Sequence, residues 1–149
     1  MGKIIDVRFG EWVCDYPLFE PYKKNEYIWN DRVLIEAIEG IKYPCYGTLM
    51  SVPILNVINK KFITHEIKNV RFENKIIVGD FRFVPTEFSL KIFSQKTVDW
   101  MFQLIFRCID EDKKITFFNI IRWDIQINTS IDLVQNTDIS KLTDILNEN

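Results

Sequence analysis

Apolar and mixed positions alternate with a period of two along residues 98–108. The even positions from Val98 to Cys108 are all apolar, whereas the odd positions between them are mixed. Because successive side chains of a strand point to opposite faces, this alternation predicts a strand. A helix over 98–109 is the competing interpretation, since several apolar residues also recur with the helical period. The uninterrupted apolar face favours the strand.

A second alternating segment, residues 115–127, follows a short polar stretch at 110–114. Two long alternating segments joined by a polar turn predict an antiparallel hairpin over 98–127. The acidic start of the turn lacks the spacing of a calcium loop and is interpreted as a solvated tip. Cys108 is expected to pack as a small core residue. The aromatic residues expected to face the core are Trp100, Phe102, Phe106, Phe117 and Trp123.

The remaining pattern is shorter and less regular. A second hairpin is predicted over 63–84, with its turn at 73–75 and with Gly79 marking a bulge or a close backbone approach. Pro85 is expected to end that hairpin. The other expected elements are a strand at 88–92, a strand at 3–14 broken by Gly10, and a polar-aromatic connection at 15–30.

Two segments predict helices. Residues 31–41 form a helix if Asn30 or Asp31 is the N-cap and Gly40 the stop, although a strand from Val33 to Ile38 fits equally well. Near the C-terminus a short helix is expected at about 138–147. It is too short to be helical without a docking surface, which we expect to be its own domain. Its apolar residues are possible interaction residues: Ile139, Leu142, Ile145 and Leu146.

Composition supports strands over helices. The chain has 23 isoleucines and one alanine, Ala37. β-branched residues pack well on a pleated sheet, and alanine is the best helix former. We therefore expect a mainly β fold: an antiparallel β-sandwich or partly open barrel with one or two short helices. At 149 residues, the chain is expected to be a single β-rich domain, 1–149.

The net charge of the chain and the lengths of its apolar runs limit which partners it binds and where in the cell it is expected. The net charge of −2 argues against nucleic-acid binding, which uses a basic surface. No apolar run is long enough to span a membrane, and the N-terminal residues do not form a classical secretion signal. We therefore expect a cytoplasmic protein, in a host cytoplasm or a virion if it is phage-encoded, with its cysteines as free thiols.

Candidate catalytic residues are few. His65 is the only histidine and matches no nucleophile signature, so it is interpreted as a surface or rim residue. The cysteines lack zinc-site spacing, and no metal or cofactor is expected. Asp99 and Asp124 share a face of the predicted hairpin and are the best candidates for a carboxylate pair. Their like charges require either an offset register or an intervening cation such as Arg122.

These observations favour a non-enzymatic protein-interaction or assembly module, with no catalytic, cofactor or metal residues. An aromatic content of 14% exceeds what one small core needs and indicates either an interface or a large β-sandwich core. The expected partner is another protein or a second copy of the chain. A phage-type structural or assembly component fits this description, as does a small inhibitor or immunity-type binding protein. A small carboxylate-dependent enzyme is the alternative from a different class.

Overall fold

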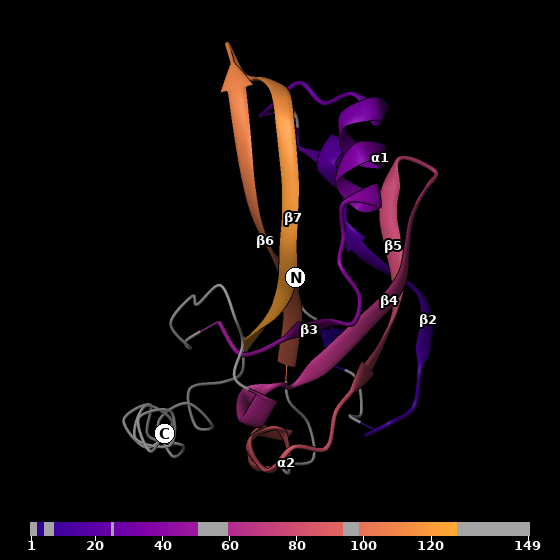
Figure 1. Cartoon of the computed structure of the whole chain (residues 1–149), viewed down its shortest axis with the longest axis vertical. Helices are drawn as coiled ribbons and strands as arrows, with labels where there is room; N and C mark the ends of the chain where they lie inside the picture. The colour runs from indigo at the N-terminus through magenta and orange to yellow at the C-terminus, as the bar shows by residue number, and fades with distance from the viewer. Residues whose placement is uncertain (1–2, 5–7, 25, 51–59, 94–98, 128–149) are drawn as a thin grey trace.

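The computed structural model describes residues 3–4, 8–24, 26–50, 60–93 and 99–127. In these residues the fold is mainly β, as the sequence predicts, with two antiparallel sheets facing each other and two short α-helices (Figure 1). None of the described helices has the length and apolar character needed to cross a membrane.

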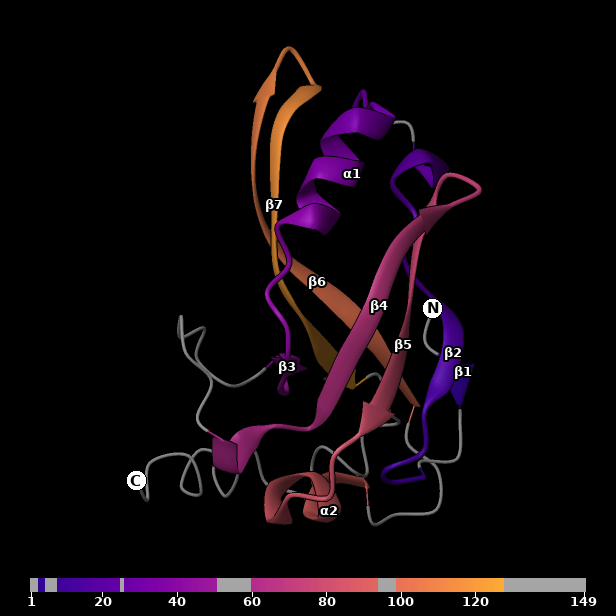
Figure 2. The ribbon, with the colours of Figure 1, turned by 45° about the vertical axis from the view of Figure 1, so that its right-hand side comes forward.

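One sheet has three strands in the order β1-β6-β7, and the other has four in the order β2-β5-β4-β3. The long β6–β7 hairpin curves over the second sheet and extends past helix α1, while α2 lies at the opposite end of the molecule (Figure 2). The strands are β1 (Lys3–Ile4), β2 (Val13–Phe19), β3 (Cys45–Gly47), β4 (His65–Glu73), β5 (Ile76–Phe83), β6 (Asp99–Glu111) and β7 (Lys114–Ile127). The helices are α1 (Asp31–Glu39) and α2 (Glu87–Phe93), with 3-10 turns η1 (Pro21–Lys23) and η2 (Lys60–Phe62).

Both predicted hairpins are confirmed, and each closes through a two-residue turn. Asp112 and Lys113 join β6 to β7 with φ values of 50° and 68°, and Asn74 and Lys75 join β4 to β5 with 52° and 65°. Positive φ at both central residues is the requirement of a type I′ turn, whose twist matches that of the flanking strands. The turns therefore set the register at the end of each hairpin.

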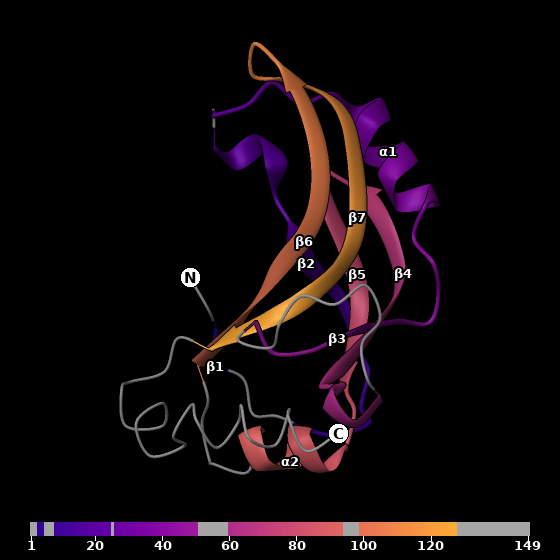
Figure 3. The same cartoon turned by 60° about the vertical axis from the view of Figure 1, so that its left-hand side comes forward.

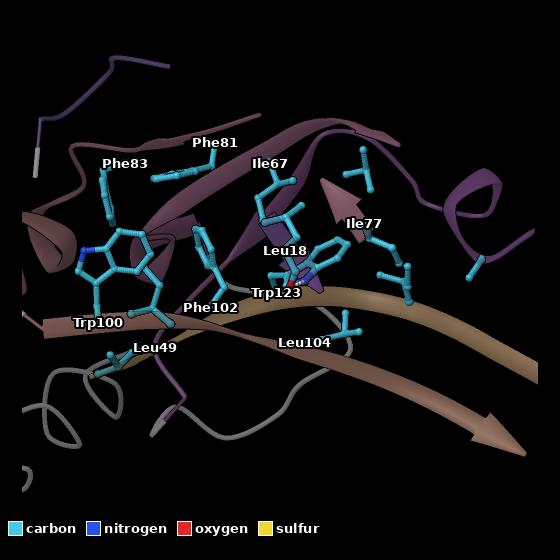
Figure 4. Packing of buried hydrophobic residues seen from close by; sticks show 14 of the residues in the cluster. Leu18, Leu49, Ile67, Ile77, Phe81, Phe83, Trp100, Phe102, Leu104 and Trp123 are labelled. Atoms are coloured by element: carbon cyan, nitrogen blue, oxygen red, sulfur yellow. Dashed lines mark hydrogen bonds between the residues drawn. The ribbon is translucent and has the colours of Figure 1, made fainter. Parts of the chain in front are cut away.

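The core lies between the two sheets, where aromatic rings of β6 meet those of β5. Phe102 sits 5.0 Å from both Trp100 and Phe81, measured between ring centroids, in edge-to-face contacts. Trp123 of β7 is fully buried, and its indole N–H donates a 3.1 Å hydrogen bond to the carbonyl oxygen of Leu18 (Figure 4). These contacts confirm the core positions predicted for Trp100, Phe102 and Trp123.

The same prediction is wrong for Phe106 and Phe117, which are exposed, and for Cys108, which is also exposed. For Phe117 the reason lies in β7, which carries one extra residue at Ile121 and another at Thr116 relative to β6. Phe106 and Cys108 keep the alternation of β6 and lie opposite the buried Ile120 and Phe118, so the bulges do not account for their exposure. Each β-bulge shifts the alternation by one position, so the face that points inward changes along the strand. Toward the turn the residues that point inward are Ile115, Phe118 and Ile120.

The bulge expected at Gly79 is present, but its extra residue lies on the partner strand β4. The register shifts between Lys68 and Arg71 on β4, opposite Gly79, and Asn69 within the shifted stretch has a positive φ of 53°. A Cβ atom at Gly79 would lie 2.8 Å from Leu18 Cδ1. The position therefore combines a bulge with a close approach by β2.

Residues 31–39 are helical, which decides between the two interpretations of that segment. The Asn30 side chain caps α1 by accepting a 2.9 Å hydrogen bond from the Val33 N–H, and the helix ends at Gly40. The helical face contains Leu34 and Ala37, both buried. Helix α1 packs against β7 and β4 and so covers one side of the space between the sheets.

Two other predictions are corrected. Residues 88–92 belong to helix α2, not to a strand, because the Thr86 hydroxyl caps the helix by accepting a 3.1 Å hydrogen bond from the Ser89 N–H. Residues 13–19 form β2, which begins within the predicted first strand and continues into the expected connection, and residues 3–4 of that predicted strand pair as β1. The predicted helix at 138–147 lies outside the described residues.

The buried and exposed phenylalanines of β6 provide a matched test of the register. Replacing Phe102 by Ala should lower the free energy of unfolding by about 3–5 kcal/mol, because it empties a closed aromatic cluster. Replacing Phe106 by Ala should cost about 1 kcal/mol, since Phe106 mainly contacts Phe118 at its edge, 5.2 Å between centroids. Urea denaturation of both variants measures the difference, and equal losses would contradict the burial of Phe102 and the exposure of Phe106.

Candidate functional site

His65 is fully buried between the sheets, so the expectation of a surface or rim histidine is wrong. It lies on β4, and its Nε2 is 2.6 Å from the main-chain oxygen of Trp123 on β7. Its Nδ1 is 2.7 Å from the hydroxyl oxygen of Thr64. The side chain therefore links the two sheets through a direct hydrogen bond in the interior.

The partners of His65 determine its protonation. A carbonyl oxygen only accepts hydrogen bonds, so Nε2 carries the proton and donates to Trp123, while Nδ1 accepts from the Thr64 hydroxyl. Burial lowers the pKa of His65 to about 4, against the opposing effect of the Trp123 hydrogen bond, and Arg122 lowers it further. The ring is thus neutral at physiological pH, with both nitrogens engaged.

Residues 47–50 connect the same two sheets through the backbone. The Gly47 carbonyl accepts a 3.0 Å hydrogen bond from the Thr64 N–H, on the side of β4. One residue later, the Thr48 carbonyl accepts a 2.8 Å hydrogen bond from the Ile125 N–H of β7. The chain leaves one sheet and joins the other at this point, which explains why Gly47 is a glycine: a Cβ atom there would overlap the Trp123 carbonyl and the His65 ring.

Asp124 and Arg122 form a buried ion pair beside this connection. Arg122 Nε donates to Asp124 Oδ1 at 2.9 Å, and the Thr48 N–H donates to the same oxygen at 3.1 Å. Both residues are less than 5% exposed. We call the set of Gly47, Thr48, Thr64, His65, Arg122, Asp124 and the Trp123 carbonyl the inter-sheet junction.

The candidate carboxylate pair of Asp99 and Asp124 is not brought together. Asp124 is opposite Gln103, and Asp99 is four residues farther along β6, a separation of about 13 Å along the strand. Asp124 is instead paired with Arg122, as the sequence predicts for the case of an intervening cation. The register therefore offsets the two carboxylates and removes the geometry that an acid-base pair requires.

The three cysteines differ in their exposure. Cys45 is buried next to the junction, and burial raises the pKa of its thiol to about 11, so the thiolate is disfavoured. Cys14 and Cys108 are exposed, and all three thiols are free. Across the described residues, no group of three or more His, Cys, Asp and Glu side chains has a geometry that could hold a metal ion.

A second feature, which the sequence analysis missed, lies at the far end of the β6–β7 hairpin. Ile109 and Phe117 are directly opposite each other and are 57% and 50% exposed, and Ile28, bridged to Lys114, is 60% exposed. We call Ile28, Ile109 and Phe117 the hairpin patch. The register places these three side chains on the outer face of the sheet. The signal in the sequence was that both faces of this part of the hairpin are apolar.

Comparisons with known proteins give one structural likeness. No family model matches the sequence, and no curated protein matches it. Among solved structures, the chain is similar to the capsid assembly protease of bacteriophage T4, with a TM-score of 0.49 and 12% sequence identity over 79% of this chain and 92% of that chain. A likeness at this level assigns neither a family nor an activity to the chain.

The pKa of His65 predicts a loss of stability in mild acid. The unfolded chain binds a proton at His65 near pH 6.5, whereas the folded chain binds it only near pH 4. The unfolded state therefore binds more protons between these values, and the free energy of unfolding falls by up to about 3 kcal/mol as pH drops across that window. Urea denaturation at several pH values measures this slope, and His65→Gln should reduce it. Because His65 is the only histidine, its NMR titration is unambiguous, and a midpoint near 6.5 in the folded protein would refute the prediction.

The close approach at Gly47 predicts a large effect from one methyl group. Gly47→Ala should lower the free energy of unfolding by more than about 3 kcal/mol, because the new Cβ displaces either the β7 backbone or the His65 ring. Gly40→Ala is the matched control: Gly40 has a helical φ of −81°, and a Cβ there would meet nothing closer than 3.5 Å. The control should be neutral or slightly stabilising in thermal unfolding.

Proposed function

We propose that this protein is a non-catalytic protein-interaction module, an assembly component that binds its partner through the hairpin patch. The observation that carries the proposal is the exposure of Ile28, Ile109 and Phe117 together on one face. Single exposed apolar residues are normal on any protein, but a cluster on one face is typical of an interaction site.

The hairpin presents this patch in a rigid, preorganised form. Ile109 and Phe117 are held opposite each other by the β6–β7 pairing, and the type I′ turn at Asp112–Lys113 closes the hairpin two pairs farther on. Ile28 is attached to the β7 edge by two backbone hydrogen bonds of 2.7 and 2.9 Å. A surface that is ordered before binding loses less conformational entropy on association.

The charge at the hairpin end favours an assembly contact over a charge-steered inhibitor. Between residues 107 and 114 the acidic groups Asp110, Glu111 and Asp112 equal the basic groups Arg107, Lys113 and Lys114 in number, so the net charge is 3 − 3 = 0. Charge-steered inhibitors rely on a strong field of one sign. Permanent assembly interfaces are more apolar, which matches the patch.

The state of the titratable groups supports the non-catalytic part of the proposal. His65 is neutral with both ring nitrogens engaged, and Asp124 is paired with Arg122 in the interior. A general base or nucleophile has to reach its substrate, so groups sealed within the junction suit a structural role. Cys14 and Cys108 are exposed, whereas His65, the single histidine, is buried.

Site-specific photo-crosslinking in the native host tests the proposal. A benzoylphenylalanine at position 109 should form a discrete adduct with a protein, whereas the same group at Leu90, which is 44% exposed on α2, should not. Adding Phe117→Asp to the position-109 protein should weaken the adduct, because it places a charge beside residue 109 in the patch. Equal adducts at both positions, or none at position 109, would refute the proposed surface.

A further inference from the structure

Among the described residues, nothing pairs with the outer edge of β6 beyond Trp100. On one side β6 pairs with β7 from Trp100 to Glu111, and on the other side it pairs with β1 only at Asp99 and Trp100. In the described part of the chain no other strand pairs with that edge. Figure 3 shows the upper half of β6 as the outermost strand, and residues 106–111 are all exposed.

This edge lacks the features with which proteins normally prevent strand addition. Between Met101 and Ile109 there is no proline and no lysine, and Arg107 is the single charged residue. Both bulges of the hairpin place their extra residue in β7, so the backbone of β6 stays regular. A regular, exposed edge presents a row of backbone N–H and C=O groups that can pair with another strand.

We propose that the partner is a second copy of this chain, whose β6 pairs antiparallel with this edge around a two-fold axis at Ile109. This inference rests on the proposed function, because it names the partner that binds at the end of the β6–β7 hairpin. In such a pair, residues opposite each other have numbers with a constant sum and point to the same face. Centring on Ile109 places Arg107 opposite Glu111 of the second copy, and this contact occurs twice.

Charge complementarity selects this register over its neighbours. Centring on Arg107 or on Asp110 would set like charges directly opposite each other, which is destabilising. Centring on Cys108 would place Arg107 opposite Ile109 and leave the charge unmatched. Arg107 and Glu111 have no ion-pair partner among the described residues, so both are available.

The same register makes the hairpin patch continuous across the two copies. Ile109 lies opposite Ile109 of the second copy, and Phe117 lies opposite Ile109 within each chain. Four apolar side chains therefore form one row on the outer face of the joined sheet, in the order Phe117, Ile109, Ile109, Phe117. The pairing uses the same edge on both copies, so it closes as a dimer and does not propagate into a fibre.

Disulfide trapping of the full-length protein tests the two-fold axis directly. In a Cys14→Ser, Cys108→Ser background, Ile109→Cys places two thiols at self-opposed positions about 4.5–5.5 Å apart at Cα, within disulfide range. Mild oxidation should convert most of this variant to a disulfide dimer. The matched control is Phe117→Cys on the same face and with similar exposure, where the two thiols would be about 14 Å apart across three strand spacings and should not link.

A charge-swap series tests the register. In analytical ultracentrifugation, Arg107→Glu and Glu111→Arg should each weaken dimerisation roughly tenfold, because each places like charges opposite each other twice. The double variant Arg107→Glu/Glu111→Arg should restore the dimer, since it regenerates both ion pairs. Failure of the double variant to recover association would overturn the Ile109 register.

The outcomes also separate this inference from the proposed function. A monomer at all concentrations, with no preferential disulfide at position 109, would overturn self-pairing. If the position-109 photo-adduct then contains a different polypeptide, the interaction surface stands and its partner is another protein. An adduct of twice the mass of the chain supports the second copy, and the absence of any adduct overturns both proposals.

Discussion

The hydrogen bond from His65 to the Trp123 carbonyl is the contact on which the arrangement of the two sheets depends. It joins β4 to β7 in a fully buried setting, where an unpaired imidazole or carbonyl would be costly. The chain at Gly47 and Thr48 reinforces the same connection by pairing first with one sheet and then with the other. The core aromatic cluster packs directly beside this connection, with the His65 ring 5.0 Å from the ring of Phe102 between centroids.

The junction also shows how the buried histidine and ion pair are used in the fold. His65, Arg122 and Asp124 satisfy one another or the backbone, and each is shielded from solvent. Breaking a buried ion pair by removing one partner leaves an uncompensated charge and is strongly destabilising. These side chains are therefore constrained by the fold, which leaves surface contacts as the source of function that we propose.

The bulges in β7 determine which of its side chains enter the core and which belong to the hairpin patch. Near the junction, Trp123 and Ile125 point inward, but beyond Ile121 the inward positions are Ile120 and Phe118. Without this change of phase Phe117 would be directed into the core, and Phe118 and Ile120 would point outward instead. One extra residue thus lets β7 contribute to the core along its length while the hairpin patch remains exposed.

Local patterns in the sequence determined the elements that depend on neighbouring residues. Alternation predicted both hairpins, Asn30 and Gly40 matched the ends of α1, and the scarcity of alanine matched a mainly β fold. The helix at 87–93 was missed because its apolar residues also alternate, although its cap at Thr86 was visible.

Tertiary structure alone decided where His65 lies, which carboxylates meet, and which face of each bulged strand is buried. Those outcomes depend on the register between strands far apart in the chain, and a single inserted residue reverses a face without changing the composition. The patch and the open edge of β6 likewise follow from which strands pair, because exposure depends on what the rest of the chain covers.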